Sequence, residues 1–359
     1  MATLSNSPFP YRERFHVLVL CSLYSEVEAA RRVLEYESES AFVDAHTEVI
    51  TGLCVCRNWN DSGLTIALIG QSDVGGKKCA SRLIHLTRLF RVDVAVMTGV
   101  CSGIERYRGA VEYGTVVVAK STSTEGEGLK RSDGKYEARG DPEKMNEDVG
   151  VVIEQAIARL GERSDWLATI PRSERLASPR YVEEMMLDEV MKSSDGVSKT
   201  DLFDKLESEE IMKNWSRKML DSILEQMVKT RGWVSVERGV VRCTASGEER
   251  ENSAFPCADK IRVVIGGIGS ISYETVNLPN DIEQYKKRMA NSQLKGIDME
   301  AYTFMSHCKE VFPGCVCLVM KGIKNDGTAN RHEYYHQFAA STPVAFLRYL
   351  LGLTPFRHL

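Results

Sequence analysis

The sequence predicts an α/β protein with a largely parallel sheet and a small helical insertion. Apolar, strand-like runs alternate along most of the chain with segments whose apolar residues recur at helical spacing, which is typical of strand–helix–strand units. The run at 92–100 is apolar except for Asp93 and Thr98, as expected of a strand buried on both faces of a sheet along most of its length. This alternation stops between residues 172 and 257, where three short helical patterns follow one another.

The strands and helices of the sheet are expected in a simple order along the chain. Strands are expected at 15–23, 48–59, 64–70, 92–100, 113–120, 260–270 and 315–323, and a strand end enters a helix within 294–310. Helices are expected at 24–36 and 75–90, and an amphipathic helix at 332–353 closes the chain. The polar, turn-rich segment 124–144 is expected to be an exposed loop or flap.

The insertion, residues 172–257, combines three helices with a hairpin. The helices are expected at 181–194, 198–208 and 216–234, and the hairpin at 233–244. Ser216 is a suitable N-cap for the third helix, Gly232 a suitable stop, and the hairpin is expected to turn at Arg238–Gly239. The segment resembles a winged helix. Its third helix mixes basic and acidic side chains, so we expect a packing or protein-binding role and do not expect nucleic-acid recognition.

Composition limits the classes of function. The 359 residues are 43% hydrophobic and 27% charged with a net charge of −4, so no basic field points to nucleic acid or an anionic membrane. No apolar run approaches the ~18 residues of a membrane span. The first residues lack the core of a signal peptide. The ten cysteines form no CxxC pair, and the seven histidines show no metal-ligand spacing. We therefore expect a cytoplasmic protein with buried, unpaired cysteines and no metal.

Five segments in order resemble the nucleoside phosphorylase/nucleosidase superfamily, with methylthioadenosine/S-adenosylhomocysteine nucleosidase-like domains closest. They are "VLVLCSLYSEVEA" (17–29), "LIGQSDVGG" (68–76), "VDVAVMTGVCSGI" (92–104), "GIDMEAYTF" (296–304) and "VMKGIKNDG" (319–327). The resemblance implies a twisted, mostly parallel mixed sheet flanked by helices, with the site at strand ends. It divides the chain into a first part of this domain at 15–171, the winged-helix-like insertion at 172–257 and a second part at 258–359.

The resemblance also implies roles for individual residues. Cleaving an N-glycosidic bond develops positive charge on the ribose and negative charge on the leaving base, so separate groups serve the two ends. Glu26 matches the carboxylate that positions the attacking water, and Glu300 the one that accepts hydrogen bonds from two ribose hydroxyls. Met299 matches a methionine packed on the sugar. The remaining matches line the substrate: Val74, Gly99, Val100, Cys101 and Ser102.

The nucleophile is expected to be water. Phosphorylases of this superfamily hold phosphate with an arginine and a serine, and here Met97 and Val100 stand at the matching positions. Neither side chain can bind phosphate. Hydrolysis is therefore favoured over phosphorolysis.

The base end departs from the family. The nucleosidases carry a Ser-Asp pair where this sequence has Lys324 and Asn325, and an amide cannot deliver a proton as a carboxylic acid does. Three interpretations remain open. Asn325 hydrogen-bonds a 6-oxopurine, a one-residue shift gives Asp326 the acid role, or the site binds without cleaving. Lys324 and Lys321 either meet a substrate phosphate or point outward from the strand end.

The favoured function is hydrolysis of a purine nucleoside or nucleotide with release of the free base, without a metal or organic cofactor, by a homodimer. A catalytically silent nucleoside or nucleotide sensor, signalling to a protein partner through residues 172–257, is the alternative. Nucleoside phosphorolysis is the third hypothesis. Turnover with and without phosphate separates the three.

Overall fold

The computed structural model describes most of the chain. The described residues are 13–35, 53–59, 62–70, 75–87, 90–104, 113–124, 128–130, 136–138, 142–160, 165–171, 179–208, 215–230, 232–244, 261–271, 283, 285, 286, 289, 291–325 and 335–353. Every structural statement below concerns these residues.

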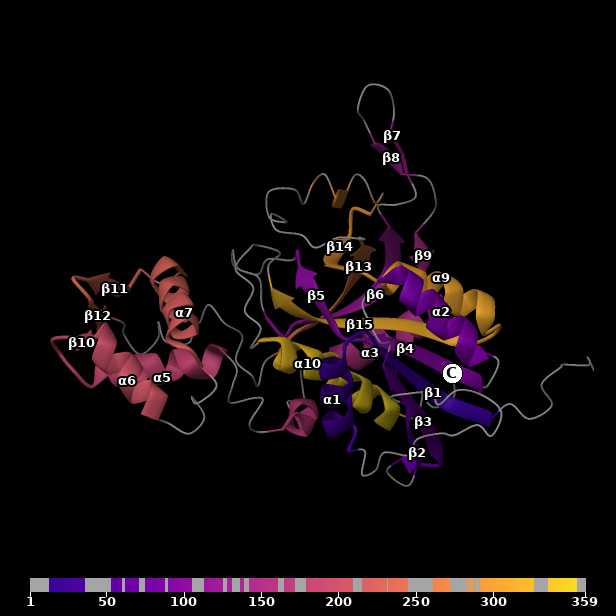
Figure 1. Cartoon of the computed structure of the whole chain (residues 1–359), viewed down its shortest axis with the longest axis horizontal. Coiled ribbons are helices and arrows are strands. Elements are labelled where there is room, and N and C mark those ends of the chain that lie inside the picture. Colours follow the sequence, from indigo (N-terminus) through magenta and orange to yellow (C-terminus); the bar gives the residue numbers. More distant parts are fainter. Residues whose placement is uncertain are drawn as a thin grey trace, which may run out of the picture.

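A ten-stranded mixed sheet forms the centre of the molecule, with the order β2-β3-β1-β4-β15-β5-β14-β13-β6-β9 (Figure 1). Its strands are β1 (Glu13–Cys21), β2 (Leu53–Trp59), β3 (Leu64–Gly70), β4 (Phe90–Thr98), β5 (Val100–Gly103), β6 (Val116–Thr124), β9 (Glu143–Lys144), β13 (Val263–Ser270), β14 (Leu294–Asp298) and β15 (Val316–Asn325). The pairs β3–β1, β1–β4, β4–β15, β15–β5, β14–β13 and β13–β6 are parallel. The remaining neighbours are antiparallel, so the predicted mostly parallel mixed sheet is confirmed.

Helices cover both faces of this sheet. One face carries α1 (Tyr24–Val33), α3 (Glu147–Leu160), α10 (Tyr335–Gly352) and the short helix η1 (Asp165–Thr169). The other face carries α2 (Gly76–Thr87) and α9 (Ala301–Val311). Alternate residues of the strands enter the two cores, as Val19 and Leu20 of β1 show.

The sheet closes on itself around β15. Besides β4 and β5, this strand pairs with β6, so β15, β5, β14, β13 and β6 form a closed ring. Because β5 runs parallel to β15 and antiparallel to β14, the end of β14 meets the middle of β15. This arrangement brings Asp298 and Glu300 to the level of Lys321 and determines the site described below.

The inserted unit has a core of its own. It consists of α5 (Pro179–Met191), β10 (Val197–Ser198), α6 (Lys199–Ser208), α7 (Arg217–Thr230), β11 (Val234–Glu237) and β12 (Val240–Cys243). Its apolar residues form a separate cluster, and Figure 1 shows the unit beside the sheet. Positive φ angles at Arg238 and Gly239, 51° and 78°, confirm the expected turn. The name winged helix stays a prediction, and both predicted domain boundaries lie outside the described residues.

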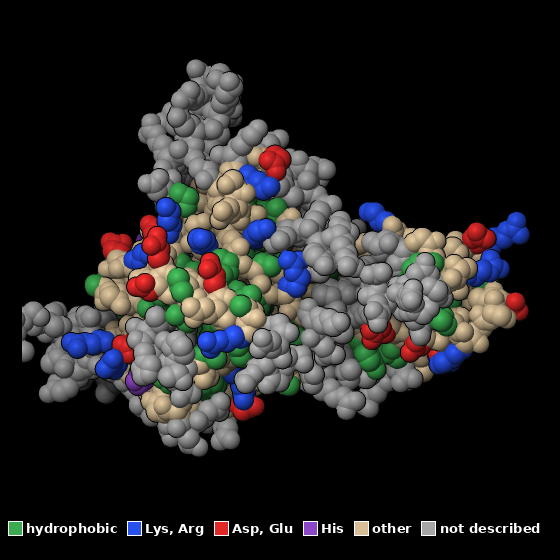
Figure 2. All heavy atoms as spheres, turned by 180° about the vertical axis from the view of Figure 1, so that it is seen from behind, with side chains coloured by type: hydrophobic (Ala, Val, Ile, Leu, Met, Phe, Trp, Pro, Cys, Tyr) green, Lys and Arg blue, Asp and Glu red, His purple; other side chains and the backbone are tan. Residues whose placement is uncertain are grey.

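The surface of the inserted unit is electrically mixed. Arg217 pairs with Asp204 and Glu207, and Lys199 pairs with Asp221. Figure 2 shows acidic and basic side chains interspersed over this unit. On the face seen in Figure 2, the described basic side chains of the unit form no continuous stripe, which is the feature that duplex binding requires.

Three local features differ from the expectations. The closing helix α10 is buried almost all round instead of on one face, because α1, η1 and β15 pack against it. The polar segment expected to be a loop contains a hairpin of β7 (Gly128–Lys130) and β8 (Tyr136–Ala138). Helix α3 and strand β10 were not expected at all. Among the described helices, none is long and apolar enough to cross a membrane.

Candidate functional site

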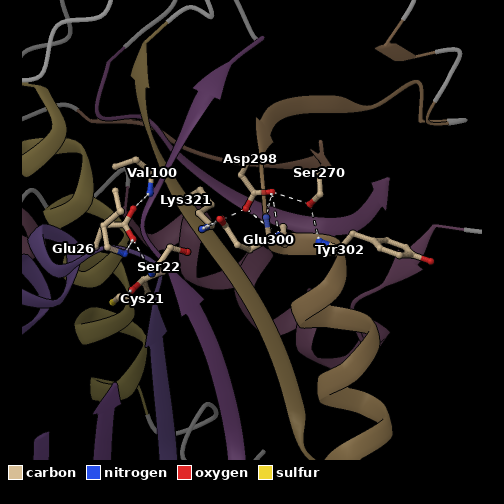
Figure 3. Close-up of polar contacts among 12 residues, drawn as sticks. Cys21, Ser22, Glu26, Val100, Ser270, Asp298, Glu300, Tyr302 and Lys321 are labelled. Carbon is tan, nitrogen blue, oxygen red and sulfur yellow. Dashed lines mark hydrogen bonds and ion pairs between the residues drawn. The ribbon is translucent and has the colours of Figure 1, made fainter. Parts of the chain in front are cut away.

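Glu26 is a buried carboxylate held by backbone donors. It lies in the first turn of α1, just after β1, and is 3% exposed. Its Oε2 accepts hydrogen bonds from the N–H groups of Ser22 and Leu23 at 2.9 and 3.0 Å, and its Oε1 accepts one from Val100 at 3.0 Å (Figure 3). A carboxylate offers about four acceptor positions. Three are occupied, so one remains for an external donor.

The absence of a side chain at Gly99 leaves the space that the Glu26 carboxylate occupies. Its φ is +137°, and a Cβ built there would lie 2.6 Å from Oε1 of Glu26. A side chain at residue 99 would therefore displace the carboxylate as well as strain the backbone. The match of Gly99 to a close-approach turn was a sequence prediction, and here the close neighbour is a functional candidate of the chain itself.

Glu300 is the second buried carboxylate, at the end of β14. It is 4% exposed, and its Oε1 accepts a hydrogen bond from the Gly75 N–H at 2.7 Å. Burial, more than any other influence, raises its pKa to about 7; the nearby Lys321 cation opposes this shift and the charge of Asp298 adds to it. Glu300 thus lies near the midpoint of its titration at neutral pH.

Asp298 holds the turn between β14 and α9 by hydrogen bonds. Its Oδ1 accepts hydrogen bonds from the Ser270 hydroxyl at 2.8 Å and from the Ala301 N–H at 3.1 Å, so the carboxylate caps the start of α9. The Ser270 oxygen in turn accepts the Tyr302 N–H at 2.9 Å. Glu300 lies between these fixed points and is oriented by them.

Lys321 lies beneath the site and is fully buried. From β15 its Nζ reaches Oδ2 of Asp298 at 3.3 Å and Oε2 of Glu300 at 3.9 Å (Figure 3). Burial alone lowers the pKa of this ammonium, but the charges of Asp298, Glu300 and Glu26 outweigh burial and raise it. The interpretation that Lys321 points outward is therefore wrong, because its side chain is buried and its partners are Asp298 and Glu300. A contact between Lys321 and a substrate phosphate stays a prediction.

The end of β15 contains a bulge at Lys324. The register with β5 shifts between Ile323 and Asn325, and Asn325 lies opposite Ser102. Asn325 is 4% exposed, whereas Lys324 is half-buried. Asp326, the alternative candidate for the acid role, lies outside the described residues, as does Val74.

The other predicted positions surround the same place. Val100, Ser102 and Met299 are half-buried, and Cys101 is buried. Met97, where a phosphorylase would hold phosphate, is fully buried in the core between the sheet and α2. The described candidate residues thus come from α1, from β5 and the glycine before it, from the residues that follow β14, and from the end of β15.

Two members of the site were not singled out from the sequence. Asp298 and Ser270 are separated by 28 positions, and only the parallel pairing of β13 with β14 brings them together. Lys321 was noted but not placed in the site. The signal was available in its position, because a lysine within the apolar run 315–323 must be buried with a partner of opposite charge.

Comparison with known proteins identifies the fold. No protein-family model and no curated protein sequence matches the chain. Among solved structures, the 5′-methylthioadenosine/S-adenosylhomocysteine nucleosidase of Colwellia psychrerythraea, in complex with adenine, is 12% identical with a TM-score of 0.53, over 95% of this chain and 96% of that one. The native futalosine hydrolase of Helicobacter pylori is 9% identical with a TM-score of 0.53, over 94% and 97%.

A third neighbour is a variant enzyme with a bound nucleoside. It is a Helicobacter pylori nucleosidase in which one aspartate is replaced by asparagine, with 5′-methylthioadenosine in its active site; it is 9% identical with a TM-score of 0.53, over 93% and 96% of the chains. At such identities these likenesses establish architecture. The chain has the α/β fold of the nucleoside phosphorylase/nucleosidase superfamily, as its sequence motifs predicted.

Proposed function

We propose that this protein hydrolyses the N-glycosidic bond of a purine nucleoside or nucleotide and releases the free base. The observation that carries the proposal is the placement of two buried carboxylates, Glu26 and Glu300, on the two sides of Lys321 (Figure 3), each held by a backbone N–H. Neighbours of the same fold are named nucleosidases, and one holds adenine. The favoured reaction is therefore a nucleosidase reaction.

The two carboxylates would serve different steps. Glu26 has one acceptor position left beyond its three backbone donors, so it can take a proton-bearing ligand such as the attacking water. Glu300 would accept hydrogen bonds from the two ribose hydroxyls, with Met299 against the sugar. Positive charge that develops on the ribose would be stabilised by both carboxylates.

The base end is proposed in two forms. Asn325, buried beside Ser102, can donate one hydrogen bond and accept another, which suits a 6-oxopurine. In the second form Asp326 supplies the proton to the leaving base. Val100 and Cys101 would pass beneath the base, Val74 would lie near the ribose, and half-buried Lys324 is the candidate contact for a 5′-phosphate.

A turnover screen tests the proposal. The full chain is incubated with adenine, guanine, hypoxanthine and pyrimidine nucleosides and their 5′-phosphates, with and without inorganic phosphate, and free base is measured by chromatography. Free purine without added phosphate, lost in Glu26→Gln, is the expected result. Release only with phosphate would replace hydrolysis by phosphorolysis. Asn325→Ala beside Asp326→Ala then shows which residue faces the base.

A catalytically silent sensor is the second candidate. It is favoured by Asn325, an amide buried at the strand end where the family places an acid. The Helicobacter pylori variant with asparagine in place of aspartate holds 5′-methylthioadenosine in its active site, which agrees with binding by an amide-bearing site. Thermal stabilisation by a nucleoside that is never cleaved would support the sensor.

The proposal includes the assembly state. A homodimer is proposed because members of the superfamily usually complete their pocket near a dimer interface. The inserted unit is the proposed surface for a protein partner. Light scattering after gel filtration measures the assembly state. Loss of partner binding in a chain with a substituted insertion tests the proposed partner surface.

A further inference from the structure

Three thiols converge at the end of β15 that lies opposite Asn325. The sulfur atoms of Cys308, Cys315 and Cys317 all lie within 4.8 Å of one another. None of the three is in a disulfide. Cys308 belongs to the last turns of α9, Cys315 precedes β15, and Cys317 is the second residue of that strand.

A tight turn between α9 and β15 creates the cluster. The Cys315 N–H donates to the Phe312 carbonyl at 3.0 Å, and Gly314 adopts a φ of +82° that favours glycine. The turn therefore returns the chain to Cys308 after only seven residues. Cys315 and Cys317 are two positions apart in extended chain, so they point to the same side. The spacing Cys-x₆-Cys-x-Cys is converted into one triangle of sulfur atoms.

The cluster is deep enough to hold a ligand and open enough to receive one. Cys308 is 0% and Cys317 6% exposed, whereas Cys315 is half-buried and provides access. Lys309 lies close by, joined to Glu143 at 2.8 Å and to the Lys144 carbonyl. A cation beside three thiols reduces the repulsion among thiolates.

We propose that Cys308, Cys315 and Cys317 bind a soft, thiophilic divalent metal ion, with Zn²⁺ as the reference ion, and leave a fourth coordination position open. Three thiolates suit zinc and other soft ions. Zinc–sulfur bonds of about 2.3 Å in a tetrahedral site place the sulfur atoms about 3.8 Å apart. The triangle in the structure therefore closes onto an ion through a shift of roughly 1 Å. The ion displaces up to three protons from the thiols and leaves a complex with one negative charge, facing Lys309.

This cluster differs from the other buried cysteines. Cys21 and Cys101 are each isolated among other side chains, and burial raises the pKa of each thiol to about 12. In the cluster, by contrast, the sulfur atoms of Cys308, Cys315 and Cys317 lie within 4.8 Å of one another. No CxxC spacing marks this cluster in the sequence, because the third sulfur comes from a helix that the fold brings alongside.

A bound ion would connect two elements that carry residues of the proposed site. Helix α9 begins at Ala301, directly after Glu300, and β15 carries Lys321 and Asn325. A metal that joins the end of α9 to the start of β15 connects the two elements that hold these residues. The ion itself would lie at the opposite end of β15 and would take no part in bond cleavage.

Metal titration of the full chain under reducing conditions tests the proposal. Zn²⁺ is titrated against a chromogenic chelator, and Co²⁺ is used to detect thiolate-to-metal charge-transfer absorption. We expect one ion per chain, with affinity at least tenfold weaker in Cys315→Ser and in Cys317→Ser. Cys243→Ser, which removes a half-buried thiol of the inserted unit, is the matched control and should bind as the unsubstituted chain does.

The outcomes separate the proposal from simple packing. Circular dichroism establishes that each variant is folded, and Cys315→Ser is the variant least able to disturb the core because its side chain is half-buried. Absence of tight metal uptake by the unsubstituted chain would overturn the proposal, and so would equal uptake by the variant that lacks all three thiols. A Co²⁺ complex without thiolate absorption would also overturn it.

Discussion

The ammonium group of Lys321 lies 3.3 Å from the carboxylate of Asp298, and the two side chains are 1% and 2% exposed. This pair lies under both candidate catalytic carboxylates, since Lys321 also interacts with Glu300 and Glu26. One buried cation thus lies among three buried carboxyl groups. Its charge lowers the free-energy cost of burying ionised carboxylates at this place.

Replacing Lys321 is expected to be strongly destabilising. Lys321→Met leaves Asp298 buried without its cation, which should cost roughly 3–5 kcal/mol of unfolding free energy. Urea denaturation measures the change. Lys309→Met is the matched control, because Lys309 is paired with Glu143 at the surface and is 41% exposed; it should cost about 1 kcal/mol or less. Equal losses in the two variants would contradict the role given to the buried pair.

Stability should also depend on pH through Glu300. Its pKa is raised from the ordinary value of 4.5 to about 7 in the folded protein, so the folded chain keeps a proton that the unfolded chain releases. The unfolding free energy therefore falls as pH rises from about 4.5 to about 7. Denaturation series across this range measure the slope. In Glu300→Gln this contribution to the slope should vanish; an unchanged slope would assign the proton to another group.

Nucleoside binding is expected to show the opposite trend. The ionised form of Glu300 accepts hydrogen bonds from two hydroxyls, and a group with a pKa of about 7 is about one-tenth ionised at pH 6 and nine-tenths at pH 8. Affinity for a ribonucleoside should therefore rise up to about tenfold over this interval. Calorimetry at both pH values measures it. A 2′,3′-dideoxynucleoside, which has no hydroxyls to donate, is the control and should bind weakly at both.

The sequence predicts the strands of the sheet, but it does not predict the strand pairing that closes part of the sheet into a ring. Largely apolar runs such as 92–100 identify the strands, and the five motifs identify where Glu26, Glu300 and Asn325 lie along the chain. The pairing of β15 with β6 joins residues far apart in sequence and leaves no local pattern. The same non-local pairing explains why the sequence leaves the direction of the Lys321 side chain open, since its partner Asp298 lies on another strand.

Gly99 offers a test of how tightly Glu26 must be held. In Gly99→Ala the new methyl group would lie 2.6 Å from the Glu26 carboxylate, so either the carboxylate or the turn must move. Misplacement of a catalytic group by about 1 Å can reduce a rate about 10²-fold, and we expect a loss of that order in free-base release. Gly63→Ala is the control, because Gly63 has a φ of +76° but open space around it. Similar rates of free-base release in Gly99→Ala and Gly63→Ala would show that the position of Glu26 does not limit the reaction.

Asn325→Asp restores a carboxyl group at the base end, and it distinguishes the enzyme from a site that binds without cleaving. Asn325 is 4% exposed, so burial would raise the pKa of an aspartate there and keep it protonated as a general acid. General acid catalysis typically contributes about 10²–10⁴-fold, and free-base release should rise toward that extent if Asn325 faces the leaving base. Asn291→Asp, which introduces a carboxyl at another buried asparagine, should bring no gain in rate. If Asn325→Asp releases the base no faster than the unsubstituted chain, while Asp326→Asn abolishes release, then Asp326 is the acid. The bulge at Lys324 would in that case direct Asp326 to the base.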